Sequence, residues 1–343
     1  MVPRYSAYAS LFPVFLQTCL AQDTSIVSVP YELTYLLPSP FHGNLFHSFV
    51  NGTNTSDTLT NELLQSATKA PFISYDDEFL ALLGQNPAIE LIEERPGNFA
   101  REAGVWISDR NELWYTTWIN DGPTHVEILD LKNNSIRNLT SSQPLKNPNG
   151  GFYHQGLINS YMFITVLPFA GDSTTTDRLP QGLWRWDSQK KVLLPAISRT
   201  EFPVANGVRP SRDQKTLWVT DFGGDERSGI WGLPAQVGAP AIYKYDLNED
   251  MWPVNKRTFG VSRMQAPDGI RIDDKGRVWT GEGEGVAVRS SQGKVIGVFN
   301  GQFFTTDSVN TAILQFELVG DVLVVLGQNK LWTVKLAETV YSA

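Results

Sequence analysis

Four segments of the chain open with a carboxylate or amide side chain followed directly by a small residue. The opening residues are Glu102, Asn149, Asn206 and Asp268. Carboxylate and amide oxygens are hard ligands, and a group of them suits Ca²⁺, Mg²⁺ or Mn²⁺. Zinc suits the set less well, because no opening residue is a histidine or a cysteine. These residue types therefore predict a site for one divalent cation, provided that the fold brings them together.

The segments behind these openings repeat one strand pattern. A short strand-like run is followed by a polar turn and by a second strand that carries Trp114, Phe163, Trp218 or Trp279. A further pair of runs with alternating apolar and polar residues comes next, so each repeat holds four short antiparallel strands. The openings recur at similar intervals along the chain, and a fainter fifth copy starts at Asn310. Four strands at this period are typical of propeller blades.

A propeller would place the openings at one point. The innermost strand of every blade lines the central channel, so residues at the same phase of different repeats should meet at the axis. There is a simpler alternative, because Asn-Gly and Asp-Gly are also strong hairpin-turn signals. On that interpretation Asn206-Gly207 and Asp268-Gly269 are turns, and Glu102 is a solvated acid. The shared phase within an otherwise apolar repeat favours the site.

The predicted fold is all-β, a six-bladed β-propeller over residues 99–338. The repeats supply five blades, and the segment 22–98 is expected to pack on the propeller or to complete it, so that one blade is either incomplete or completed from the N-terminus. The candidate strands lie in VSVPYELTYLL and AIELIEERP. No amphipathic helix of ordinary length follows residue 99, which argues against a Rossmann or an α/β-hydrolase fold. The chain also lacks the G-x-S-x-G motif of serine esterases.

The N-terminus and the charge bear on the location and partners of the protein. Residues 1–21 contain Arg4, an apolar stretch and a small-residue end, the pattern of a secretory signal peptide. The segment includes Cys19, the only cysteine, so the mature chain should contain no disulfide. A net charge of −8 over 343 residues argues against nucleic acid and anionic membranes as partners. Four sequons predict N-glycosylation of a secreted protein, at Asn51, Asn54, Asn133 and Asn138.

Several segments resemble the family of SMP-30, gluconolactonases and related lactonohydrolases, especially its secreted fungal-type branch. The resemblance covers residues 72–336 and is carried by FISYDDEFLALLG, REAGVW, NGGFYHQG, NGVRPSRDQKTLWVTD, APDGIRIDDKGRVW and EGEGVAVRSSQGKVIG. It implies a six-bladed propeller with one divalent cation at its axis, usually calcium. It also implies hydrolysis of lactones or related esters.

The resemblance assigns roles by position. Glu102 corresponds to a carboxylate ligand of the metal, Asn206 to the amide ligand, and Asp268 to a second carboxylate that is both ligand and proposed base. Glu102 and Asp268 are therefore the expected catalytic residues. The expected chemistry is attack on the lactone carbonyl by a water molecule that the metal activates and Asp268 deprotonates.

Three further residues are expected to contact the substrate. Asn149 resembles the Asn-Gly-Gly loop of the fungal branch. His154 follows closely and could face the channel as an acid–base group, although a structural hydrogen bond is the simpler role for such a histidine. Arg101 stands where this branch often has histidine, and its fixed charge cannot relay a proton.

The repeat spacing and the resemblance leave three functions open. Asn149 and Asn206 are separated by the length of a single blade, so either a blade is missing or one polar residue serves where the family uses two. The first expectation is a secreted, metal-dependent hydrolase that opens a small lactone or related cyclic ester. The alternatives are a tailoring enzyme of secondary metabolism, which would steer a cyclisation or rearrangement, and a catalytically silent propeller that only binds a ligand.

Overall fold

The computed structural model describes residues 25–43, 47–118, 125–140, 161–166, 182–198, 200–201, 204–223, 240–305 and 311–342. The predicted signal peptide (1–21), Asn149 and His154 lie outside these residues. No helix in the described ranges combines the length and the apolar character needed to cross a membrane.

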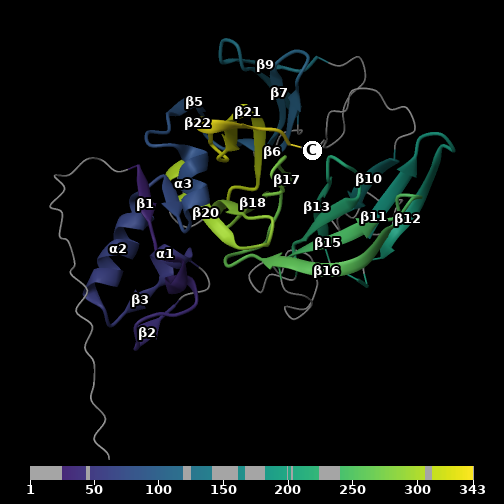
Figure 1. Ribbon diagram of the computed structural model, residues 1–343. Coiled ribbons are helices and arrows are strands. Elements are labelled where there is room, and N and C mark those ends of the chain that lie inside the picture. The colour runs from purple at the N-terminus through teal and green to yellow at the C-terminus, as the bar shows by residue number, and fades with distance from the viewer. Residues whose placement is uncertain are drawn as a thin grey trace, which may run out of the picture.

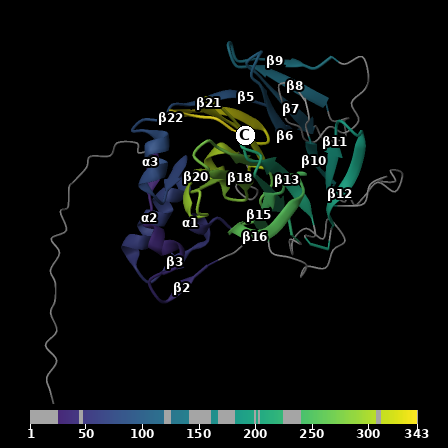
Figure 2. The same cartoon turned by 45° about the vertical axis from the view of Figure 1, so that its right-hand side comes forward.

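Five antiparallel sheets follow one another around a common centre in Figures 1 and 2. Their strands are β6 (Asn98–Ile107), β7 (Glu112–Trp118), β8 (His125–Asp130) and β9 (Ser135–Asn138); β10 (Tyr161–Val166), β11 (Gly182–Asp187) and β12 (Val192–Ser198); β13 (Ala205–Pro210), β14 (Thr216–Asp221), β15 (Ala241–Leu247) and β16 (Pro253–Val261); β17 (Ile270–Ile272), β18 (Val278–Glu282), β19 (Gly285–Arg289) and β20 (Val295–Asn300); and β21 (Gln315–Leu326), β22 (Lys330–Val340) and β5 (Ile89–Glu94). This arrangement confirms the predicted propeller class.

The predicted count of six blades is not confirmed, because the described residues form five. The N-terminal strands that join the ring are added to the outer edges of existing blades and form no further blade. β5, from the predicted segment AIELIEERP, pairs with β22 and becomes the outer strand of the fifth blade. β1 (Ile26–Ser28) and β4 (Phe72–Ser74) extend the fourth blade beyond β20. β5 and β1 are therefore the outermost strands of these two sheets.

The ring closes between its first and last blades. β5 immediately precedes β6 in the chain, yet the two strands belong to different blades. A bridge between Ala100 of β6 and Gln328 fixes the junction. The first blade is therefore tied to the last by covalent continuity and by backbone hydrogen bonds, as in propellers whose ring is closed by distant parts of the chain.

The remaining elements cover the fourth and fifth blades on one side (Figure 1). They are a 3₁₀ turn (Tyr31–Thr34), β2 (Phe41–His42), α1 (Phe49–Gly52), β3 (Asn54–Thr55), α2 (Thr58–Lys69), α3 (Asp77–Leu83) and α4 (Gly301–Phe304). Phe79 of α3 packs edge-on against Phe299, which stacks on Trp279 at 5.8 Å between ring centroids. All three side chains are fully buried, so this aromatic group anchors α3 to the propeller.

Candidate metal and catalytic site

The innermost strands of four blades bring polar side chains together at the axis. Glu102 lies in β6, Asn206 in β13, Asp268 two residues before β17, and Gln315 begins β21. The Gln315 side chain donates a hydrogen bond from Nε2 to Asp268 Oδ1 at 3.3 Å and also bonds to Glu102. Asn206 is hydrogen-bonded to Asp268. Residues that are far apart in the chain thus form one cluster.

Local irregularities aim two of these side chains. The pairing of β6 with β7 shifts register on both sides of Glu102, and Ala103 has a positive φ of 70°. The pairing of β13 with β14 shifts between Ala205 and Val208, which is where Asn206 lies. Bulges of this kind redirect a side chain at the end of a strand.

The two glycines next to the openings permit the close approach of the strands. A Cβ atom on Gly207 would overlap the carbonyl oxygen of Asp268, and one on Gly269 would overlap the Gln315 side chain. Asn206-Gly207 lies within β13, and Asp268-Gly269 lies before β17 and forms no hairpin turn. The alternative interpretation of these pairs as turns is therefore wrong, because close packing at the axis explains the glycines.

Thr220 of β14 fixes the spacing between two of the openings. Its hydroxyl donates to the Asp268 carbonyl oxygen at 2.7 Å and accepts from the Gly207 amide at 2.6 Å. The Asp268 and Gly269 amides donate to Gly281 and Leu314 carbonyls at 2.8 and 2.9 Å. Asp268 is thus held by main-chain bonds on both sides, in a position where only 5% of it is exposed.

The carboxylates of Glu102 and Asp268 carry unfavourable charge. Burial, and then the nearby charge of Asp268, raise the pKa of Glu102 well above its usual value. Burial also raises the pKa of Asp268 to about 6, although hydrogen bonds from Asn206 and Gln315 and the charge of Arg101 act in the opposite direction. Arg101 Nε lies 3.8 Å from Glu102 Oε1. Two carboxylates and one guanidinium leave a net negative charge in a largely buried place.

The donor set fits a hard divalent cation. It comprises two carboxylates and two side-chain amides, all oxygen donors that Ca²⁺, Mg²⁺ and Mn²⁺ accept. Within the described residues no three His, Cys, Asp or Glu side chains gather, so neither a thiolate nor an imidazole site competes with this one. A bound cation would offset the charge of the buried carboxylates, which the single guanidinium only partly balances.

Gln315 was not predicted from the sequence. The fifth opening predicted from the sequence, Asn310, lies outside the described residues, whereas the side chain at the cluster is five positions later. The available signal was a lone polar residue within the apolar run AILQFELV. This signal is weak, because no small residue follows Gln315 as one follows each of the other openings.

The remaining predicted residues have different surroundings. Arg101 lies beside Glu102, as described above. The four sequon asparagines are all exposed: Asn51 in α1, Asn54 in β3, Asn133 after β8 and Asn138 at the end of β9.

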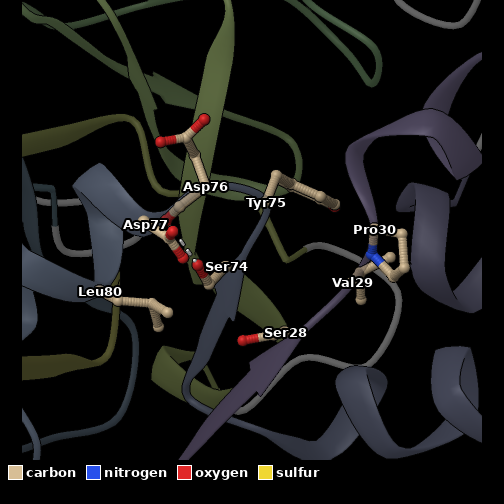
Figure 3. Close-up of a pocket in the computed structure, with 8 residues that line it drawn as sticks. All are labelled: Ser28, Val29, Pro30, Ser74, Tyr75, Asp76, Asp77 and Leu80. Atoms are coloured by element: carbon tan, nitrogen blue, oxygen red, sulfur yellow. Dashed lines mark hydrogen bonds between the residues drawn. The ribbon is translucent and has the colours of Figure 1, made fainter. Parts of the chain in front are cut away.

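A hollow of about 240 Å³ lies away from the axis, between β1, β4 and α3 (Figure 3). Asp76, one of its two acidic residues, caps α3 by accepting from the Glu78 amide at 2.9 Å and pairs with Lys294 at 2.5 Å. Ser74 also lines the hollow, and its hydroxyl donates a hydrogen bond to the Asp76 carbonyl oxygen. These polar groups are used within the fold, so the hollow is a weaker candidate than the axial cluster.

Comparison with known proteins identifies a related sequence and structures with the same fold. The chain is 25% identical to lactonohydrolase oryH of Aspergillus oryzae, over 85% of this chain and 87% of that protein. A gluconolactonase structure from Xanthomonas campestris superposes with a TM-score of 0.53 at 16% identity, over 77% of this chain and 94% of the other. A protein assigned to the gluconolactonases gives the same TM-score at 14% identity, over 78% and 98%.

The family model for the SMP-30/Gluconolactonase/LRE-like region matches residues 122–306, more than half of the chain. The matched region includes Asn206 and Asp268, while Glu102 and Gln315 flank it. This match confirms the resemblance that the sequence motifs indicated, and the chain belongs to the SMP-30/gluconolactonase/LRE-like family.

Proposed function

We propose that the protein is a hydrolase that opens a lactone or related cyclic ester. The proposed holders of a divalent cation for this reaction are Glu102, Asn206, Asp268 and Gln315. Calcium is the first candidate for this cation, and magnesium and manganese are the alternatives. The observation that carries the proposal is the meeting of two carboxylates and two amides from four blades. The family and the lactonohydrolase relative favour lactone chemistry.

Asp268 is the proposed base. With a pKa of about 6, its carboxylate is ionised at neutral pH and basic enough to accept a proton from the attacking water. Main-chain bonds and the Thr220 hydroxyl hold its backbone, so the carboxylate is positioned before substrate arrives. A bound divalent cation would supply the Lewis acid that polarises the ester carbonyl and acidifies the water.

Arg101 is proposed to bind the substrate and not to exchange protons. Its guanidinium is permanently charged and lies at the edge of the cluster, where 26% of the side chain is exposed. It can therefore donate hydrogen bonds to a ring or hydroxyl oxygen of a lactone. Asn149 and His154 remain proposed substrate contacts.

We also propose that the protein is secreted and carries N-linked glycans. The signal-peptide pattern of residues 1–21 supports secretion, and the exposure of all four sequon asparagines supports glycosylation. Release from the secretory pathway of a eukaryotic host, with a mass decrease after treatment with peptide N-glycosidase, would test both statements.

Hydrolysis is tested with protein stripped by EDTA and assayed with γ- and δ-lactones in a pH-stat, with and without Ca²⁺. We expect acid release that depends on the cation and that falls by at least about 100-fold in Glu102→Gln and in Asp268→Asn, both of which should retain the fold by circular dichroism. Full turnover in either variant would remove that residue from the site.

The same protein preparation separates the two alternatives. A cation that raises the melting temperature of a protein inert to every lactone would favour a tailoring enzyme. A protein whose melting temperature does not respond to millimolar cation and that opens no lactone would favour a silent binding propeller.

A further inference from the structure

A second group of charged side chains lies on the same innermost strands, deeper in the ring. It consists of Arg209 on β13, Arg271 on β17 and Glu317 on β21. Each lies two or three residues beyond a member of the candidate metal site. At about 3.3 Å per residue, the two groups are roughly 7–10 Å apart.

Arg271 and Glu317 satisfy each other. Arg271 Nε and Nη2 donate to the two Glu317 oxygens at 2.8 and 2.9 Å, a bidentate pair. The other Arg271 donors reach the carbonyl oxygens of Ile270 at 2.8 Å and Gly104 at 2.5 Å. Arg271 and Glu317 are 4% and 6% exposed. The single carboxylate of the group is therefore committed to Arg271.

The positive charge of the Arg209 guanidinium is poorly compensated by the described residues around it. Its Nε makes one long hydrogen bond to the Ile270 carbonyl oxygen at 3.4 Å, and no described residue accepts from its two Nη groups. Arg209 is partly accessible. Burial and the charge of Arg271 outweigh the attraction of Glu317 and lower the Arg209 pKa to about 9. Two guanidiniums and one carboxylate leave one positive charge in excess.

We propose that Arg209 binds a small monovalent anion in the propeller channel, either a halide or the carboxylate group of a small organic acid. The excess charge of the group is one unit, which a monovalent anion neutralises. The Nη groups, from which no described residue accepts a hydrogen bond, form the planar fork that suits a carboxylate and that also donates to a halide. The site is distinct from the candidate metal site, whose net charge has the opposite sign, and it does not depend on the proposed hydrolysis.

The proposal is tested by thermal unfolding in an anion-poor HEPES buffer titrated with sodium bromide or sodium acetate. For the wild type we expect a saturable rise in melting temperature, of about 5 °C at 100 times the dissociation constant. Arg209→Met should lose this saturable rise. Arg212→Met, which removes an exposed arginine three residues later, should retain it and so controls for general salt effects.

The two salts distinguish the source of the anion. Saturation at lower acetate than bromide concentration would indicate an organic acid, and the reverse order would indicate a halide. Arg209→Met should also melt above the wild type without added anion, because it removes a poorly compensated charge. Identical responses of the wild type and Arg209→Met to both salts would overturn the proposal.

Crystallography tests the site even if Arg209→Met fails to fold. A wild-type crystal soaked in sodium bromide should give an anomalous peak within hydrogen-bond distance of the Arg209 Nη atoms. A soaked crystal without a peak there, together with no saturable response to acetate in the wild type, would also overturn the proposal.

Discussion

Arg101 offers the sharpest test of the electrostatics of the candidate metal site. Its Nε lies 3.8 Å from a Glu102 oxygen, where unit charges interact by about 4 kcal/mol at an effective dielectric constant near 20. The guanidinium already neutralises part of the negative charge that would attract a divalent cation. It also repels that cation. Replacing Arg101 by Gln should therefore strengthen cation binding.

The size of the effect follows from the exposure of this pair. Because 26% of the Arg101 side chain and 16% of the Glu102 side chain are exposed, solvent screens the interaction. If about a third of the roughly 4 kcal/mol remains after screening, the loss of Arg101 should make the free energy of cation binding about 1.4 kcal/mol more favourable. This corresponds to a tenfold lower dissociation constant of the cation.

The measurement is isothermal titration calorimetry of Ca²⁺ into EDTA-stripped protein at neutral pH and low salt. Arg110→Gln is the matched control, because Arg110 is an exposed residue in the turn at the far end of the same hairpin and its loss changes the net charge equally. We expect tighter binding only for Arg101→Gln. Unchanged or weaker binding in this variant would refute the reasoning that Arg101 competes with the cation.

Three further predictions concern the neighbours of the site. Gln315→Leu removes an amide donor without changing charge, so Ca²⁺ affinity should fall by about tenfold in the same titration; an unchanged affinity would exclude Gln315 as a ligand. Gly207→Ala should lower the melting temperature and abolish Ca²⁺ binding, because its Cβ would overlap the Asp268 carbonyl oxygen; a wild-type melting curve would show that the strands are not so close. The pKa of Asp268 rises from 3.8 to about 6 on folding, so its stabilising contribution is complete below pH 3.8 and is lost as the pH rises through 6. Urea unfolding of the metal-free D268N variant should therefore vary less between pH 4 and 7 than that of the metal-free wild type; equal pH dependence would contradict the shift.

The sequence was sufficient to predict the propeller and three members of the cluster. Glu102, Asn206 and Asp268 stand at the same phase of a repeat, and repetition carries this information even when each motif alone resembles a turn. Gln315 was not predicted because its repeat is the faintest and because the residue that follows it is not small. The residues that hold the site in place, such as Thr220, carry no local signal.

The number of blades could not be derived from local pattern. AIELIEERP was recognisable as a strand, but whether it starts a new blade or joins an existing one depends on its pairing with β22, the last strand of the chain. The same holds for β4, whose partner β20 belongs to the fourth blade and is separated from it by three whole blades of sequence. Pairings of this range are decided by which sheet edges remain open after the ring has formed, and no short window of sequence contains that information.

The central claim is that side chains from four blades hold one divalent cation at the axis of the propeller. The most direct test is a crystal of the protein grown with Mn²⁺ and measured for anomalous scattering. The account predicts one strong peak in contact with the side-chain oxygens of Glu102, Asn206 and Asp268, and its loss in crystals of Asp268→Asn. A peak bound elsewhere, or no peak at the axis at saturating Mn²⁺, would contradict it.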